Sequence, residues 1–425
     1  MSITMAASRV PAPRRNLTVV AGAIGNVLEW YDFAAYGFLA QSFARNFFPL
    51  NNDLLSLMAS YGVFAVAFLM RPIGGVLFGH VGDRVGRRAA LILSVLAMAI
   101  PSFAIGLLPT YAAVGVVAPV MLILLRCLQG LSVGGELTIS IVYLGEQSDH
   151  RNRGLGASWT FFGSMFGALC GSLVVGLLST ALGRDAIMAW GWRLPFLGSG
   201  VIGLAALALR FVGVVREALP SAPTATAPVV VAFVTEWRAM AAAYLFCVPA
   251  GVAYYIGLIY LTVFVQRFDA IPAAEADYLV SLGMVTVMVG MPLFGALSDR
   301  IGRQTVMLCG AIGLILYAGP MFWMMTQHKP WLAFAGEFGF AICDAAYAAP
   351  LPAMLGMQFR PEARCTAASI SYNTAMATLG GTAPMIAVYL IARTGLVTAP
   401  AWFMAASAAV GLVGVLLARE VPDQA

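Results

Sequence analysis

Several charged side chains of this chain stand inside long apolar segments, where a charge needs a chemical reason. A charge at the middle of a bilayer costs roughly 2.5–3.5 kcal/mol. Glu29 and Asp32 lie three positions apart and share one helical face, and Asp32 is about 22 Å along its helix, near mid-depth. Arg126 reaches a similar depth in another segment, which also holds Glu136. Burial favours a neutral carboxyl group and an arginine favours its charged form, so we predict proton coupling at Asp32, Glu29 and Glu136.

The elements that hold these charges are predicted to be membrane helices. The chain is 61% hydrophobic and 10% charged, with a mean hydropathy of +0.87, whereas a soluble protein has about 25% charged residues. Such a surface faces hydrocarbon, where the backbone must form helices. We predict an all-α membrane protein with twelve transmembrane helices, each about 20 residues or longer, at approximately 17–42, 54–79, 89–109, 113–144, 155–180, 190–212, 239–266, 276–297, 305–326, 330–357, 366–392 and 397–418.

Two charged loops repeat one pattern, once in each half of the chain. Phe78–Arg88 reads F-G-H-V-G-D-R-V-G-R-R, and Phe294–Gln304 reads F-G-A-L-S-D-R-I-G-R-Q. Internal repetition between membrane spans is typical of a duplicated transporter. We expect the loop charges to be exposed and to pair across the interface between the halves as a cytoplasmic gate, formed by Gly79, Asp83, Arg84, Gly86, Arg87, Gly295, Asp299, Arg300, Gly302 and Arg303.

A segment rich in proline and alanine separates the two halves. It predicts an N-terminal six-helix bundle (1–212), a cytoplasmic linker without an obvious amphipathic helix (213–238) and a C-terminal six-helix bundle (239–425). Most arginines fall on the side of the termini, so the positive-inside rule predicts that both termini are cytoplasmic, in a cell inner membrane. The chain has one lysine, Lys329, and no Walker phosphate loop, so ATP is not the expected energy source.

Polar and aromatic residues inside the predicted spans are candidates for a substrate cavity. Guanidinium groups bind carboxylates through two parallel hydrogen bonds, so Arg126 and Arg71 are predicted to bind an anion. The six cysteines are scattered singly and the three histidines lie near loops, so we expect no metal site and no cofactor. The other candidate substrate-binding residues are Tyr31, Trp159, Tyr254, Tyr255, Asp344 and Asn373.

Taken together, these motifs resemble the major facilitator superfamily and, within it, the metabolite:H⁺ symporter family. The two D-R-x-G-R loops and R-C-L-Q-G at Arg126–Gly130 resemble superfamily motifs, and G-N-V-L-E-W-Y-D-F, M-R-P-I-G-G and W-G-W-R-L-P-F resemble the symporter family. That family includes citrate, 2-oxoglutarate, shikimate and proline/betaine carriers. The resemblance implies proton-coupled uptake by alternating access, with coupling roles on Asp32, Glu29 and Arg126.

Our first interpretation is a proton symporter that imports a small organic acid anion, a mono-, di- or tricarboxylate, and that is not an enzyme. The expected partners are the organic acid, protons and the lipid bilayer, with no nucleic acid, and the expected state is a monomer. An alternative is a betaine- or proline-type zwitterion:H⁺ symporter. Its mark would be an aromatic cage for a quaternary ammonium group, which Trp159, Tyr254 and Tyr255 could supply. A less favoured alternative is a drug/H⁺ antiporter.

Overall fold

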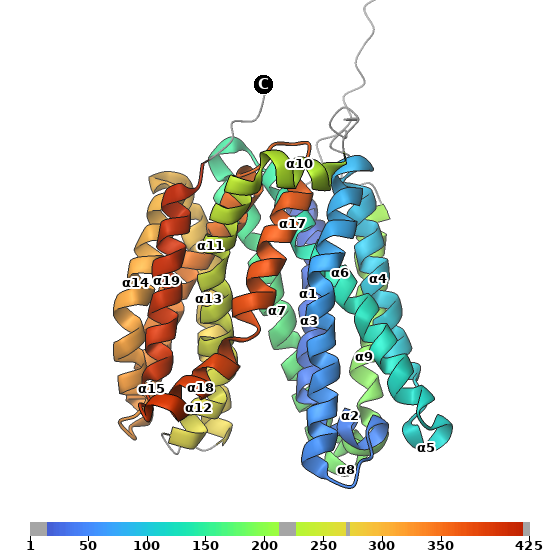
Figure 1. The fold of residues 1–425 in the computed structure, drawn as a ribbon. Helices are drawn as coiled ribbons and strands as arrows, with labels where there is room; N and C mark the ends of the chain where they lie inside the picture. The colour runs from blue at the N-terminus through green and yellow to red at the C-terminus, as the bar shows by residue number, and fades with distance from the viewer. Residues whose placement is uncertain (1–14, 212–226, 269–272, 420–425) are drawn as a thin grey trace, which may run out of the picture.

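The computed structural model describes residues 15–211, 227–268 and 273–419, and the chain is helical almost throughout them (Figure 1). Eleven helical segments of this part are long and apolar enough to cross a membrane. A further long helix, α1 (Arg15–Phe38), has 24 residues and packs along one of them, α7 (Arg153–Leu182). The prediction of an all-α membrane protein is confirmed.

The N-terminal half is a bundle in which long helices pack in pairs, α3 along α6, α1 along α7 and α4 along α9. Short helices join them at the end of the bundle shown at the bottom of Figure 1. The further elements of this half are α2 (Ala40–Phe47), α3 (Asp53–Arg84), α4 (Arg87–Leu107), α5 (Tyr111–Val114), α6 (Val117–Gln147), the 3₁₀ turn η1 (His150–Asn152), α8 (Arg184–Ala186), the π turn η2 (Ile187–Gly191) and α9 (Arg193–Phe211).

The C-terminal half repeats this plan, but three of its predicted spans are interrupted. The span predicted at 239–266 contains the π turn η3, and the span predicted at 366–392 contains the π turn η4. The span predicted at 330–357 divides into α15 and α16. The elements are α11 (Trp237–Ala253), η3 (Tyr254–Tyr260), α12 (Leu261–Phe268), α13 (Ala273–Ile301), α14 (Arg303–Met324), α15 (Pro330–Ala348), α16 (Leu351–Met357), α17 (Arg364–Ala375), η4 (Met376–Gly380), α18 (Ala383–Thr394) and α19 (Ala399–Leu417).

The two halves lie side by side and approach each other most closely at one end. This end holds α10 (Pro228–Thr235), and we call it the α10 end (Figure 1). Helix α3 contacts α17 and α7 contacts α13, while α16 packs against both α6 and α7. Helix α10 lies within the segment predicted as a linker without an obvious amphipathic helix. It contacts α3, α11 and α17, and the proline at its first position is a favoured helix start.

Glycines allow the helices of the N-terminal half to touch. The spacing of Gly163, Gly167 and Gly171 predicts close packing of one helix face. The structure confirms this, because an ideal Cβ at Gly167 would lie 2.3 Å from the backbone oxygen of Val27, and one at Gly171 would lie 2.6 Å from that of Tyr31. Helix α7 therefore rests directly on the backbone of α1.

Gly167→Ala should lower the midpoint of thermal unfolding of the purified protein. The added methyl group would meet backbone atoms that cannot turn aside, and overpacking of this kind costs about 1–3 kcal/mol. Gly176 lies on the same helix, and an added Cβ there meets nothing within 4 Å. Gly176→Ala is therefore the matched control and should leave the midpoint unchanged or slightly raised; equal midpoints for the two variants would contradict the packing account.

Candidate substrate pocket and gate

A pocket lies between the two halves and is lined by residues of both. The N-terminal half contributes side chains from α1, α3 and α7, and the C-terminal half contributes α11, η3, α13, α15, α17 and η4. The lining is mostly apolar and aromatic, with one arginine and one carboxylate, as expected of a small-molecule site. The lining residues are Trp30, Arg71, Phe161, Ser164, Met165, Ala250, Tyr254, Tyr255, Val287, Met291, Asp344, Ala348, Tyr372 and Met376.

Arg71 is the cationic group of this pocket. Its side chain is 2% exposed, and its Nε donates to Asn373 Oδ1 of the opposite half at 3.2 Å. Its Nη2 has no hydrogen-bond partner in the described part of the chain. Asn373 is held in turn, because its Nδ2 donates to the backbone oxygens of Gly134 at 2.7 Å and Ser369 at 2.9 Å. Arg71 is thus positioned with part of its guanidinium available to an anion.

Aromatic rings surround the other part of the pocket. The Trp30 and Tyr254 ring centroids are 5.1 Å apart, and those of Tyr254 and Tyr255 are also 5.1 Å apart, both nearly perpendicular. The two tyrosines begin the π turn η3, and such turns occur frequently at functional sites. Asp344 lies in the same pocket with 3% exposure, and its Oδ1 has no partner among the described residues. Rings and a carboxylate form a site suited to a cation.

The structure separates the predicted substrate-binding residues into two groups. Arg71, Tyr254, Tyr255 and Asp344 line the pocket, with Asn373 behind Arg71. Arg126, Tyr31 and Trp159 are not among its lining residues.

Tyr31 points away from the pocket, since its hydroxyl donates to the backbone oxygen of Pro195 at 3.0 Å. The Trp159 ring packs against Phe162. Trp30 and Tyr372 line the pocket but were not predicted, because the sequence does not indicate which face of a helix meets the opposite half.

Asp32 and Arg126 belong to a buried polar cluster inside the N-terminal half. Asp32 accepts hydrogen bonds from Ser102 and from Gln129, the latter at 3.0 Å. The guanidinium carbon of Arg126 lies 3.7 Å from the centroid of the Tyr36 ring, and none of its three nitrogens has a hydrogen-bond partner in the part of the chain described. The acid and the arginine are within electrostatic range without a direct bond, an arrangement in which their pairing can change.

Glu136 occupies a different environment. Arg210 Nη2 lies 2.5 Å from Glu136 Oε1, and both side chains are almost fully buried. Glu136 also accepts a hydrogen bond from Ser94, while Arg210 donates to the backbone oxygen of Leu91. These contacts join α4, α6 and α9, as a structural ion pair does. Glu29 lies nearer the pocket, within electrostatic range of Arg71, and its Oε2 has no partner in the described residues.

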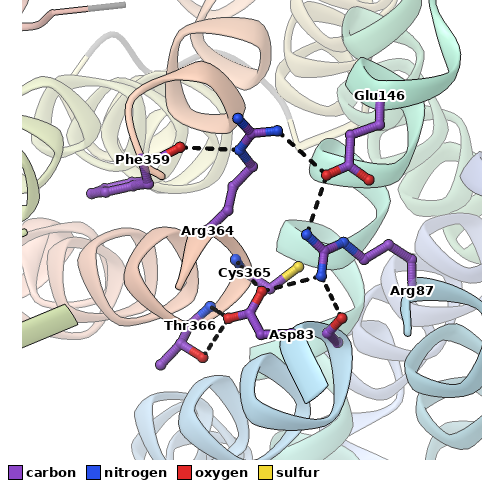
Figure 2. A network of polar contacts seen from close by, with 8 residues as sticks. Asp83, Arg87, Glu146, Phe359, Arg364, Cys365 and Thr366 are labelled. Atoms are coloured by element: carbon purple, nitrogen blue, oxygen red, sulfur yellow. Dashed lines mark hydrogen bonds and ion pairs between the residues drawn. The ribbon is translucent and has the colours of Figure 1, made fainter. Parts of the chain in front are cut away.

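The first repeated loop holds the two halves together at the α10 end (Figure 2). Asp83 accepts hydrogen bonds from the backbone N–H groups of Cys365 at 3.0 Å and Thr366 at 2.9 Å, and from the Thr366 hydroxyl at 2.8 Å. These groups begin α17 in the opposite half. A carboxylate at a helix N-terminus satisfies free N–H groups and interacts favourably with the helix dipole.

Charged side chains extend this network around Asp83 (Figure 2). Arg87 contacts Asp83 at 3.2 Å and Glu146 at 3.2 Å, and Arg364 of the opposite half contacts the same Glu146 oxygen at 3.4 Å. Asp83 is 5% and Arg87 6% exposed. The expectation that these loop charges are exposed was wrong for this pair, because the neighbouring half covers them.

The second repeated loop makes the equivalent contact in the opposite direction. Asp299 accepts from the backbone N–H groups of Gly154 at 2.7 Å and Leu155 at 2.9 Å, at the start of α7, and Arg303 lies 3.3 Å from Asp299. Each loop therefore binds the first turn of a helix in the other half, rather than the other loop. We call these two contacts the helix clamps.

Glycines of both loops serve the clamps. Gly86 and Gly302 have φ angles of 121° and 101°, which favour glycine. An ideal Cβ at Gly79 would lie 2.8 Å from Thr366 Cα, and one at Gly295 would lie 2.6 Å from Ser158 Oγ. Arg84 and Arg300 are exposed and lie at the outer surface of the loops.

A profile of the family described as Major Facilitator Superfamily matches this chain at residues 22–335 and 269–425. The chain belongs to the major facilitator superfamily. It is 31% identical to the glycine betaine/proline/ectoine/pipecolic acid transporter OusA of Dickeya dadantii, over 97% of this chain and 84% of that protein. It is 30% identical to the proline/betaine transporter of Escherichia coli, over 96% and 84% of the two chains. These relatives place it in the metabolite:H⁺ symporter group, which consists of transporters and not of enzymes.

Solved structures show the same fold. The proton:xylose symporter XylE bound to 6-bromo-6-deoxy-D-glucose aligns with a TM-score of 0.77 at 17% identity, over 95% of this chain and 94% of that one. The human organic anion transporter MFSD10 (TETRAN) aligns with a TM-score of 0.67 at 14% identity, over 96% and 100%. At these identities the likeness concerns the fold alone, and it confirms the predicted arrangement of two helical halves.

Asp83→Asn should shift the protein toward a conformation that is open at the α10 end. Asparagine has one acceptor oxygen where aspartate has two, and a hydrogen bond to a charged group contributes about 1.5–3 kcal/mol, so the two-state equilibrium should change by about tenfold or more. Distances between spin labels on the α10 ends of the two halves would measure the shift. Asp299→Asn should act in the same direction, because it removes the equivalent clamp.

Arg300→Gln is the matched control for both clamp variants. It removes an exposed charge from the same loop as Asp299 without touching a clamp, so its distance distribution should match that of the unmodified protein. If Asp83→Asn and Asp299→Asn also leave that distribution unchanged, the clamps do not set the conformation.

Proposed function

We propose that this protein is a proton-coupled symporter which imports a zwitterion of the betaine or proline type by alternating access. The observation that carries the proposal is the pocket between the halves, where Arg71 offers guanidinium donors and Asp344 with four aromatic rings (Trp30, Tyr254, Tyr255 and Tyr372) offers a cation site. A zwitterion carries a negative group that Arg71 can bind and a positive group that Asp344 and the rings can bind. The named substrates of the two relatives are zwitterions of this kind.

Our first interpretation from the sequence, an organic acid anion, has less support. A carboxylate held by Arg71 is equally expected for both substrate classes. A di- or tricarboxylate would, however, bring a second negative charge toward Asp344 and the faces of the rings, where like charges repel. Rings that carry a negative face attract a quaternary ammonium group instead, so the pocket and the relatives favour the alternative.

Proton coupling is assigned to Asp32, with Arg126 and Glu29 as its partners. Asp32 is fully buried and within electrostatic range of Arg126, whose nitrogens form no hydrogen bond in the described part of the chain. A change in the separation of this pair would change the proton affinity of the carboxyl group. Glu136 is the weaker candidate, because Arg210 already holds it in one arrangement.

The helix clamps assign this structure to a state that is shut at the α10 end. The arginine-rich loops lie at this end, so we place it in the cytoplasm, with both chain termini, and the protein in the cell inner membrane. The pocket would then receive its substrate from the opposite, external side. Breaking both clamps would allow the halves to separate at the cytoplasmic end.

Arg71→Lys should weaken binding of glycine betaine and proline strongly. Lysine keeps the charge but loses the planar donor pair that fits a carboxylate, and disturbing one partner of a buried charge pair costs about 2–5 kcal/mol, or about 30-fold or more in affinity. Isothermal titration calorimetry of the purified protein would measure this. Arg126→Lys is the matched control, because the same substitution lies outside the pocket; a larger loss in Arg126→Lys than in Arg71→Lys would contradict the assigned site.

Asp32→Asn should abolish substrate accumulation driven by a pH gradient and spare substrate counterflow. The amide keeps the shape of the side chain but cannot bind or release the proton. Both processes can be measured in proteoliposomes with radiolabelled glycine betaine. Accumulation by Asp32→Asn at the level of the unmodified protein would remove Asp32 from the coupling mechanism.

Glu136→Gln provides the comparison for this experiment. It neutralises another buried carboxylate of the same half, but one that is paired with Arg210. Breaking such a pair leaves a buried charge uncompensated and costs about 3–5 kcal/mol. We expect a lower thermal midpoint and less active protein, with coupling retained in the fraction that folds.

A further inference from the structure

The C-terminal half contains a buried carboxyl group that the mechanism above does not use. Glu337 lies on α15 and its side chain is 0% exposed. Neither of its carboxyl oxygens has a hydrogen-bond partner within the described residues. A buried charged group without a partner is strongly disfavoured, and such groups become neutral instead.

The described residues packed around Glu337 leave space for its carboxyl group but supply neither a hydrogen bond nor an opposite charge to it. Gly283 of α13 faces it so closely that an ideal Cβ there would lie 1.9 Å from Glu337 Oε1. Tyr317 of α14 lies nearby, but its hydroxyl donates to the backbone oxygen of Ala335 at 3.1 Å. No lysine or arginine of the described residues forms an ion pair with Glu337.

The charged group that acts on Glu337 is another acid, Asp344. The two residues are seven positions apart on α15, and so lie on the same face about two turns from each other. Asp344 lines the substrate pocket, where the titratable groups that accompany it are Arg71, Tyr254, Tyr255 and Tyr372. Cys343 and Tyr347 on α15 are further titratable groups near Asp344. Cys247 on α11 lies near Tyr347. Two interacting carboxyl groups without a cation of their own hold at least one proton between them.

We propose that Glu337 is a second proton-binding site, in the C-terminal half, which retains its proton while the cationic group of the substrate lies beside Asp344. This proposal rests on the proposed function. With the pocket empty, the two acids hold one proton between them, and either can carry it. When a quaternary ammonium or protonated amine lies beside Asp344, it favours the ionised form of that carboxyl group, so the shared proton resides on Glu337 and crosses the membrane with the substrate. No bond other than O–H changes in this step.

The position of Glu337 suits this role. Helix α15 begins at the end opposite to α10, so Glu337 lies between that end and Asp344, which is about two turns deeper (Figure 1). In the state shut at the α10 end, protons would reach Glu337 from the same side as the substrate. The site is also separate from Asp32, which lies inside the other half.

The test is the ratio of proton flux to substrate flux in proteoliposomes, measured together with a pH-sensitive dye and radiolabelled glycine betaine. Glu337→Gln should bind glycine betaine within about threefold of the unmodified protein but move about one proton fewer for each substrate. Glu337→Asp, which keeps a titratable group, should restore the ratio. Tyr317→Phe is the matched control, since it alters a neighbour of Glu337 without removing a carboxyl group, and should keep the original ratio. An unchanged ratio in Glu337→Gln would overturn the proposal.

A second measurement covers the case in which Glu337→Gln folds but transports too slowly for flux ratios. The infrared difference spectrum between the unmodified protein and Glu337→Gln at neutral pH should contain the C=O stretch of a protonated carboxyl group, and its absence would overturn the proposal. Failure of the proposed function is recognised separately. In that case the unmodified protein would neither bind nor exchange glycine betaine or proline, whatever the state of Glu337.

Discussion

A charge away from water is stable only beside groups that compensate it, and this constraint organises the whole molecule. Some buried charges here are fully compensated. Glu136 has Arg210, while Asp83 and Asp299 have the N–H groups of helix starts. These charges hold helices or halves together.

Other buried charges lack such compensation, and they include the charged residues of the candidate site. Arg71 and Asp344 have unpartnered atoms at the pocket, and Arg126 and Glu337 have none of their polar atoms hydrogen-bonded within the described chain. A substrate can supply the missing partner at Arg71 and Asp344, an ionised Asp32 can compensate Arg126, and a proton can neutralise Glu337.

The helix clamps connect this local chemistry to the conformation of the whole protein. Each clamp consists of a carboxylate in one half and the free N–H groups at a helix start in the other half, so it exists only while the halves touch at the α10 end. The duplication of the loop yields two clamps of the same design, at Asp83 where α3 meets α17 and at Asp299 where α13 meets α7. Opening at this end must break both, which suits a molecule that changes between two states rather than continuously.

The sequence by itself determined the class of protein and singled out the two repeated loops that form the helix clamps. Hydropathy decides which segments face hydrocarbon, and the repeated D-R-x-G-R loops are local motifs that remain recognisable without a structure. Four residues of the pocket, Arg71, Tyr254, Tyr255 and Asp344, could also be named, because they are charged or aromatic side chains inside predicted spans. The boundaries of α10 and of the π turns could not, since they depend on tertiary contacts and not on hydropathy.

Only the tertiary structure decided which of these side chains meet. Trp30 and Tyr31 are neighbours in the sequence, yet one lines the pocket and the other bonds to Pro195, because successive helical residues point in different directions. Arg71 and Arg126 are equally costly in a membrane, but Arg71 lies on the face of α3 that meets α17, whereas Arg126 packs on Tyr36 inside its own half. The periodicity of a spanning helix shows that it crosses the membrane; which of its faces meets the substrate depends on how the two halves pack.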